Sequence, residues 1–150
     1  MSHVEENARE LERLTELVGR LTDDDLDQPV TDQWSVADVL GHMAFWDARA
    51  LALAEKLDGK IPFTESDHEP ADVDVLNAAA ARLVQAIPRR QAAELALQMA
   101  RQVDALVARL PAEKMWPDDR GSPLNCFRAN HRSEHLGDIE EALESASGGG

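Results

Sequence analysis

Hydrophobic residues recur at helical spacing from the start of the chain. Over residues 4–21, apolar side chains return every three or four positions, which is the period of an amphipathic helix. Ser2 followed by Glu5 has the spacing of a capping box, which is typical of a helix start. The acidic stretch 22–27 and then Pro29 do not continue the pattern. The sequence therefore predicts a first helix that ends before this acidic turn.

A second helix is predicted directly after Trp34. Ser35 and Asp38 have the spacing of another capping box, and Trp34 is placed to pack as a hydrophobic staple on Val39. The segment that follows, to about residue 57, is apolar on more than half of its circumference. A helix with so little polar surface belongs at the centre of a bundle.

Prolines divide the rest of the apolar pattern. A third helical segment is predicted from Pro70 to a break at Pro88, and a longer helix from there to Pro111. The pair at 122–123, Ser-Pro, supplies a cap and a first-turn proline for the last helix.

Together these segments predict an all-α protein, a four-helix bundle with one additional short helix. Residues 1–146 are expected to form a single domain, which at this length can bury a real core. The Ser- and Gly-rich residues 147–150 are expected to be a disordered tail.

Charge narrows the range of partners. The chain carries 15 Lys and Arg against 29 Asp and Glu, a formal net charge of −14, and no stretch clusters its basic residues. The attraction to phosphate that dominates nucleic-acid affinity is therefore missing, and anionic membrane surfaces are disfavoured for the same reason. We expect no nucleic-acid and no membrane partner.

The sequence also favours a cytoplasmic location. No apolar run approaches the roughly 20 residues that span a bilayer, and the first twenty residues are too charged for a secretory signal. The single cysteine, Cys126, has no partner within the chain for a disulfide, which fits a reducing compartment.

Two histidines in the last predicted helix are the main chemical feature. His131 and His135 are four residues apart, so their Cβ atoms lie roughly 5–6 Å apart on one face of a helix. Apolar residues precede and follow them on the same stripe, which predicts that the rings point inward. At this separation two imidazoles can bind one divalent metal ion.

His42, in the second helix, is the candidate for a third ligand. A shift of the chain by 89 residues superposes several apolar positions and loop residues and places His42 on His131, as an internal repeat would. Three histidines would leave a fourth position for water or substrate, the arrangement of catalytic zinc. Nickel, manganese or iron are alternatives to zinc. Each histidine could instead be a core residue bonded to a carbonyl or a carboxylate.

Other residues are weaker candidates. Glu134 lies between the two histidines and could be a general base, although a solvated carboxylate is an equal alternative. Cys126 is close in sequence but is more consistent with a buried spectator thiol. His3 and His68 are expected to be solvated, and Trp46, one turn after His42, could line a pocket or simply pack in the core.

The chain resembles the DinB/YfiT-like superfamily of small helical bundles. The resemblance rests on Trp34-Ser35-Val36-Ala37-Asp38-Val39-Leu40-Gly41-His42 and on the late stretch Asn130-His131-Arg132-Ser133-Glu134-His135, and it covers nearly the whole chain. In that superfamily the bundle binds one divalent metal ion through three histidines, which match His42, His131 and His135 here.

The resemblance also implies a range of activities. Relatives include thiol S-transferases that use bacillithiol or mycothiol, a mycothiol-dependent maleylpyruvate isomerase and a hydrolase. It implies a metal-dependent transfer of a low-molecular-weight thiol onto a small molecule, because a metal-bound thiol is deprotonated. The alternatives are hydrolysis of a small reactive substrate, since the same metal would lower the pKa of water, or a non-catalytic stress or binding protein. A homodimer is a further expectation, although no stretch identifies its interface.

Overall fold

The computed structural model describes residues 2–148, and all of the regular elements in that range are helices. Its elements, in chain order, are α1 (His3–Arg20), α2 (Asp23–Asp27), α3 (Val36–Asp58), the 3-10 helix η1 (Glu65–Asp67), α4 (Val73–Val84), α5 (Arg89–Arg109), the 3-10 helix η2 (Ala112–Lys114) and α6 (Arg128–Gly148). The predicted all-α class is confirmed. The described residues hold two additional α-helices, however, because the acidic turn itself forms α2.

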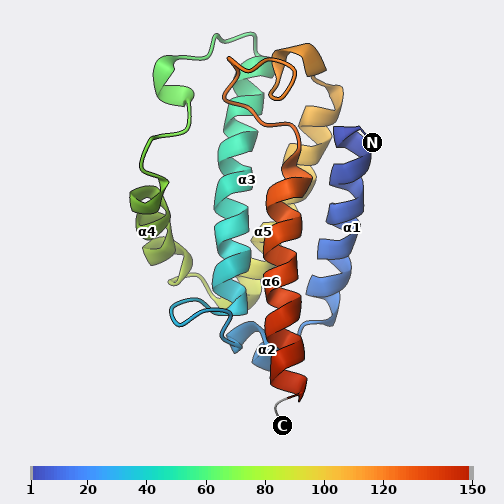
Figure 1. Cartoon of the computed structure of the whole chain (residues 1–150), viewed down its shortest axis with the longest axis vertical. Coiled ribbons are helices and arrows are strands. Elements are labelled where there is room, and N and C mark those ends of the chain that lie inside the picture. Colours follow the sequence, from blue (N-terminus) through green and yellow to red (C-terminus); the bar gives the residue numbers. More distant parts are fainter. Residues whose placement is uncertain (1, 149–150) are drawn as a thin grey trace.

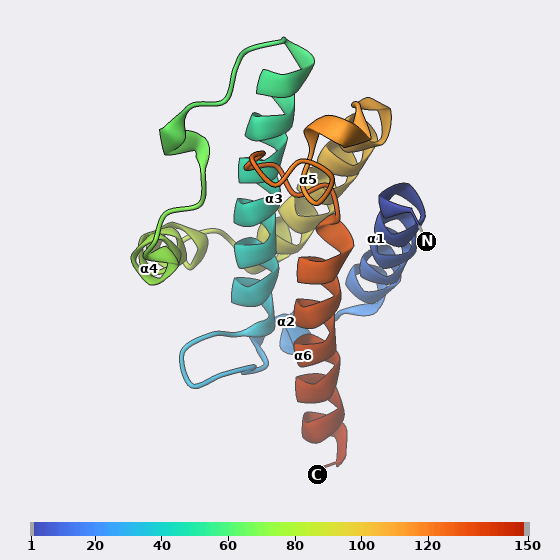
Figure 2. The same ribbon diagram turned by 45° about the horizontal axis from the view of Figure 1, so that its top comes forward.

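Four long helices form the bundle (Figure 1). α1 and α6 run in one direction and α3 and α5 in the other, and α3 packs against α5 along much of its length. Because α3 and α5 run parallel, a long connection is needed between them. That connection contains η1 and α4, and α4 lies beside α3 outside the four-helix core (Figure 2).

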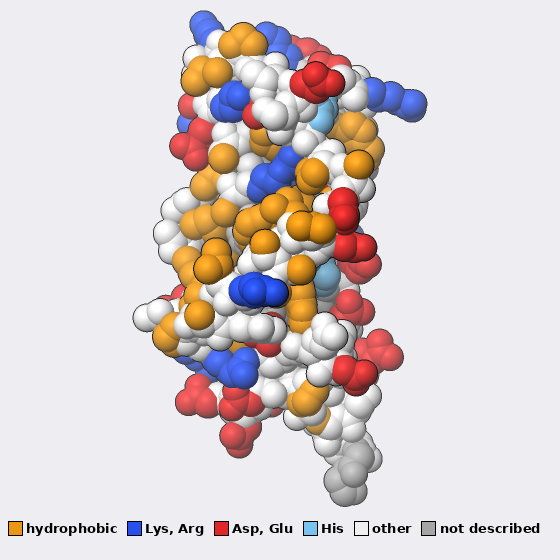
Figure 3. Space-filling model, turned by 90° about the vertical axis from the view of Figure 1, so that its left-hand side faces the viewer, with side chains coloured by type: hydrophobic (Ala, Val, Ile, Leu, Met, Phe, Trp, Pro, Cys, Tyr) orange, Lys and Arg blue, Asp and Glu red, His pale blue; other side chains and the backbone are white. Residues whose placement is uncertain are grey.

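The outer surface of the molecule on the side of α4 exposes many apolar side chains. Hydrophobic side chains gather there in the space-filling view (Figure 3). On α4 itself, Val75 is 65% exposed and Leu83 is 74% exposed. An exposed apolar patch of this kind is typical of an interaction surface. The homodimer expected from the sequence stays a prediction, and this face is where it can be tested.

Local capping sets the start of α3. The hydroxyl of Ser35 accepts a hydrogen bond from the backbone N–H of Asp38 (3.2 Å), and the carboxylate of Asp38 accepts one from the N–H of Ser35 (3.0 Å). The predicted capping box is therefore confirmed. Its consequence for function is that the first seven residues of α3 are held in register up to His42.

The start of α6 differs from the prediction. The helix begins at Arg128 rather than at the Ser-Pro pair of residues 122–123, which lies in the preceding loop. The backbone N–H of Ala129 is capped by the side chain of Asn7, which comes from α1 (2.8 Å). Similarly, α4 begins at Val73 behind the capping residue Asp72 rather than at Pro70. In both cases a better acceptor for the free N–H groups lies further along.

The end of α6 also differs from the prediction. The helix continues through Gly148, so residues 147 and 148, which the sequence places in a disordered tail, are helical. No proline interrupts the backbone hydrogen bonds of this segment, and small residues are tolerated in a last turn. Residues 149 and 150 lie outside the described residues. Among the described helices, none is long and apolar enough to cross a membrane.

The two halves of the chain repeat the same arrangement of elements. α1 ends at Arg20 and α5 ends at Arg109; the short helices that follow, α2 and η2, begin at Asp23 and Ala112. Each pair is 89 residues apart, as the sequence comparison predicts. The long helices that follow bring His42 and His131 to the same level of the bundle, one on α3 and one on α6.

Candidate metal centre

His42 lies on the inner side of α3 and is 8% exposed. The indole of Trp34 packs edge-on against its ring, with the ring centroids 4.8 Å apart. No hydrogen bond joins a ring nitrogen of His42 to a residue in the described part of the chain. The nitrogens are not sealed in the core, because the ring lines a cavity from which a ligand could reach it.

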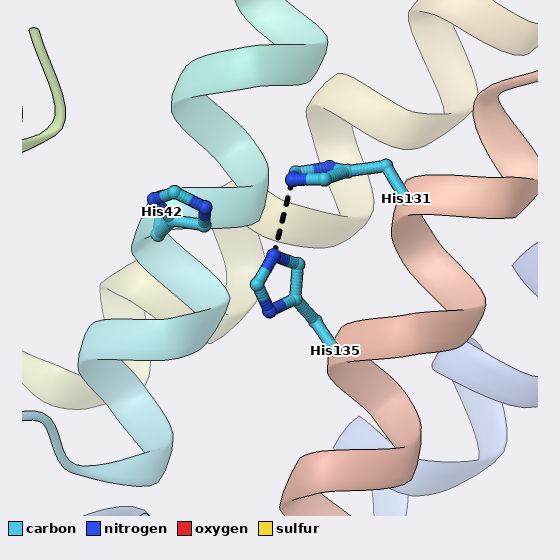
Figure 4. A group of neighbouring side chains, drawn as sticks. All are labelled: His42, His131 and His135. Carbon is cyan, nitrogen blue, oxygen red and sulfur yellow. Dashed lines mark hydrogen bonds between the residues drawn. The ribbon is translucent and has the colours of Figure 1, made fainter. Parts of the chain in front are cut away.

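His131 and His135 approach the same point from α6 (Figure 4). Their Nε2 atoms are 3.0 Å apart, which is hydrogen-bond distance if one nitrogen carries a proton and the other does not. The centroid of the His42 ring lies 5.4 Å from that of His131 and 4.8 Å from that of His135. The structure thus brings together the three histidines that the sequence singles out.

The geometry fits a single small cation. One ring nitrogen from each histidine can be chosen so that no pair is more than 4.8 Å apart. Metal–nitrogen bonds of roughly 2.0–2.1 Å in a tetrahedral site hold their nitrogens about 3.3–3.4 Å apart, so the widest pair must close by roughly an ångström, which rotation of the rings about their side-chain bonds can supply. That these residues bind a metal stays a prediction.

The site keeps its imidazoles neutral. Burial lowers the pKa of His42 to about 4, and the nearby ring of His135 contributes in the same direction. Burial lowers the pKa of His131 to about 3, helped by His135, Arg128, His42 and Arg132. Burial also lowers the pKa of His135, although Glu134 and Asp138 partly oppose it. Neutral imidazole is the form that binds metals, so the site is ready for one at neutral pH.

A cavity of about 280 Å³ opens onto two of the three histidines. His42 and His131 line it together with Trp46, Arg49 and Asn77. Its size is near the lower limit for sites that bind small organic ligands, about 300 Å³. His135 does not line the cavity, so a ligand would reach the histidines from the side of His42 and His131.

The same side of α6 also carries a network of buried charges, because Arg128 and Arg132 lie within one turn of His131 and His135. Arg132 donates two hydrogen bonds to the carboxylate of Asp104, each of 2.9 Å, and one to Asp47 (3.4 Å). Arg128 donates to the other oxygen of Asp47 (3.0 Å). The backbone carbonyl of Asn7 also accepts from Arg132 (3.2 Å). Two carboxylates thus balance two guanidinium groups between α3, α5 and α6.

The weaker candidates are placed apart from the histidines. Glu134 is exposed and does not line the cavity, which favours the solvated alternative. Cys126 is buried, donates to the carbonyl of Trp116 (3.0 Å), and its thiol pKa is raised by burial, so it is a spectator. His68 is exposed, as expected. His3 is not simply solvated, because its Nε2 contacts the carbonyl of Val107 (3.3 Å).

Sequence reasoning named Trp46 as a residue that could line a pocket, which the structure confirms, but it missed Arg49 and Asn77. Arg49 follows His42 by seven positions, so helical periodicity places it on the same face of α3 as His42 and Trp46. That signal was available and would have identified this residue of the cavity wall. By contrast, the contact of Trp46 with Asn77, and that of Arg128 with Asp47, join residues far apart in the chain.

These features define the class of protein. The all-helical bundle is consistent with the fold of the DinB-like superfamily. Residues 8–145 match the family model described as the mycothiol maleylpyruvate isomerase N-terminal domain, and the chain belongs to this family. The resemblance read from the sequence is thereby confirmed. No curated protein and no solved structure matches the chain.

Proposed function

We propose that this protein is a divalent-metal-dependent enzyme that transfers a low-molecular-weight thiol, mycothiol or a related one, onto an electrophilic small molecule. The observation that carries this proposal is the convergence of three neutral, buried or half-buried imidazoles, two of which line a cavity. Membership of a family described by its mycothiol-associated isomerase supports the choice of thiol chemistry. A cytoplasmic location, where such thiols are kept reduced, belongs to the same proposal.

In this proposal His42, His131 and His135 hold the ion, with zinc as the first candidate. A divalent metal bound there would lower the pKa of a thiol so that it reacts as a thiolate at neutral pH. The thiol sulfur then forms a bond to the electrophilic carbon of the second substrate while the bond from that carbon to its leaving group breaks; the leaving group departs with the electron pair, and the thiol proton is lost to solvent. The walls of the cavity orient both molecules, and their reacting atoms meet beside His42 and His131.

Metal binding is the first test. We expect purified protein to bind one equivalent of zinc or nickel, and His42→Ala and His135→Ala to lose it. At a free metal concentration a hundred times Kd, binding should stabilise the wild type by about 2.7 kcal/mol. His68→Ala removes an exposed histidine outside the cluster and is the matched control, which should keep both effects. Unchanged metal content in His42→Ala would remove this residue from the site.

Dependence on the thiol is the second test. Metal-loaded protein is supplied with an electrophilic reporter of C–S bond formation, with and without mycothiol. Turnover that requires the thiol and disappears in His42→Ala supports the proposal. Turnover without any thiol would favour hydrolysis, in which water replaces the thiol as nucleophile. An unaltered melting temperature with every divalent metal tested, together with no turnover, would favour a non-catalytic binding protein of the same fold.

A further inference from the structure

The cavity beside the histidines has a second chemical feature, the guanidinium group of Arg49. Arg49 lines the cavity together with His42 and Trp46. These three residues lie on one face of α3, because they are separated by four and then three positions. At 1.5 Å of rise per residue, Arg49 lies about 10 Å from His42 along the helix axis. The cavity therefore has a reactive end and a charged end.

The guanidinium of Arg49 is held in place by neutral groups. One of its nitrogens donates to the backbone carbonyl of Asp67 (2.7 Å), and its central carbon lies 5.8 Å from the centre of the Trp46 ring. The indole is held in turn by a hydrogen bond from its Nε1 to the side-chain oxygen of Asn77 (2.8 Å). The position of the charge is thus set without an anionic partner.

Among the described residues, no carboxylate lies within ion-pairing distance of Arg49. The carboxylate of Asp67, the nearest candidate by sequence, pairs with Lys56 instead. Arg128, the other arginine that lines the cavity, is already paired with Asp47. Glu69 also lines the cavity but forms no ion pair with Arg49. A guanidinium has five N–H donors, and the single hydrogen bond to Asp67 leaves most of those of Arg49 available.

We propose that the cavity takes an elongated small molecule whose carboxylate is bound by Arg49 while its reactive end lies at the three histidines. The inference rests on the proposed function for the reactive end only. Charge-assisted hydrogen bonds from a guanidinium to a carboxylate are short and directional, so Arg49 selects for both charge and length. The carboxylate could belong to the thiol or to the electrophile, and the chemistry at Arg49 is the same in both cases.

A series of mercaptocarboxylates measures this arrangement. Cobalt(II) replaces the native metal, so that thiolate binding is followed by visible absorption rather than by activity. Mercaptooctanoate is long enough to reach Arg49 from the metal, mercaptopropionate is too short, and mercaptooctanol is the neutral counterpart. In the wild type, mercaptooctanoate should bind about tenfold more tightly than mercaptooctanol. Mercaptopropionate should show no dependence on residue 49.

The preference for the acid should disappear in Arg49→Gln and persist in Arg101→Gln, which removes an exposed arginine of α5 outside the cavity. The comparison of acid with alcohol also separates recognition from packing. If Arg49 only fastens the loop through the carbonyl of Asp67, Arg49→Gln weakens both ligands equally. An unchanged ratio of the two affinities in Arg49→Gln would overturn the proposal.

A second arm needs no metal and separates the two proposals. Octanoate and octanol are titrated into the metal-free protein by calorimetry, with the same variants. Preference for octanoate that depends on Arg49 supports the anion site even if the protein binds no cobalt and the proposed function fails. Repeating the titration of the loaded protein with saturating mycothiol, which carries no carboxylate, and with bacillithiol, which does, assigns the carboxylate. Exclusion of octanoate by bacillithiol alone places it on the thiol, and continued binding with both thiols places it on the electrophile.

Discussion

Two clusters on the same side of α6 show two ways of placing polar groups inside the bundle. In the arginine cluster, Arg128 and Arg132 are bonded to Asp47 and Asp104, so that each buried charge has an opposite charge in contact with it. In the histidine cluster, the Nε2 atoms of His131 and His135 are 3.0 Å apart, the ring of His42 lies close to both, and burial lowers the pKa of all three rings. The first cluster is charged and paired, whereas the second is neutral and borders a cavity.

This difference separates a structural cluster from a functional one. Buried charges that are paired and hydrogen-bonded join helices but leave no group free to react. Within the arginine network, only the Nε of Arg132 is buried without a partner. Neutral imidazoles form no ion pairs and do little for stability, yet they are the form that binds a metal. The arginine cluster therefore holds α6 in position, and the histidine cluster uses that position.

The largest expected effect comes from breaking the arginine network. In Asp47→Asn the side chain keeps its size but loses the charge that both guanidinium groups share. An uncompensated buried charge typically costs about 3–5 kcal/mol, so we expect a loss of that order in the free energy of unfolding. Urea denaturation of the metal-free protein measures it directly.

Asp138→Asn is the matched control for this experiment. Asp138 is an exposed carboxylate of α6 near His135, outside the network. Substitutions at such surface positions usually change stability by no more than about 0.5 kcal/mol. Equal effects of the two substitutions would show that the network does not hold α6. The contrast between the arginine and the histidine clusters would then fail.

A smaller effect on the free energy of unfolding is expected when pH changes the protonation of the histidine cluster. An unfolded histidine titrates near pH 6.5, whereas the pKa of folded His42 is lowered to about 4. Between these values the unfolded chain binds more protons than the folded one, so stability falls as the pH is lowered from about 6.5 towards 4. The slope is at most about 1.4 kcal/mol per pH unit for each histidine.

The contribution of one histidine is isolated by difference. Burial raises the pKa of Asp104, which changes stability in the opposite direction at acidic pH, but it does so in every variant. The metal-free His42→Ala protein should therefore lose less stability than the wild type between pH 7 and pH 5. His68→Ala, which removes an exposed histidine, should retain the steeper slope of the wild type. Parallel slopes in the wild type and His42→Ala would contradict a neutral, buried His42.

Local signals explain which parts of the fold could be predicted. The start of α3 depends on Ser35 and Asp38, which are three residues apart, so the sequence contains the whole capping interaction. The start of α6 depends on Asn7, which lies in another helix and 122 residues away from Ala129. No pattern within residues 122–130 reveals that acceptor. The prediction for α6 therefore failed at its first residue but not in its helical face.

The same distinction applies to the site. The spacing of His131 and His135 and the internal repeat that relates His42 to His131 were sufficient to predict that the three rings meet. The arginine network was not predictable in this way, because Asp47 and Asp104 contribute to it from two other helices. A single charged residue in an apolar helix has no signal that names its partner. Only the packing of the bundle pairs them.

Glu134→Gln should have the smallest effect. This residue lies in sequence between His131 and His135 but is exposed to solvent. Burial lowers the pKa of His135, and the charges of Glu134 and Asp138 oppose that shift. Removing one of these charges should lower the pKa slightly further, which an NMR titration of the His135 ring can measure.

The imidazole of His135 is neutral at pH 7 with or without that charge, so the lowered pKa leaves its metal-binding form unchanged. Metal affinity and the free energy of unfolding should therefore stay within about 0.5 kcal/mol of the wild type. Turnover of the thiol-dependent reaction should be equally unaffected, because Glu134 does not line the cavity. A tenfold or greater loss of turnover with metal binding intact would instead assign Glu134 the role of general base. It would also extend the functional face of α6 from the buried histidines to the solvent.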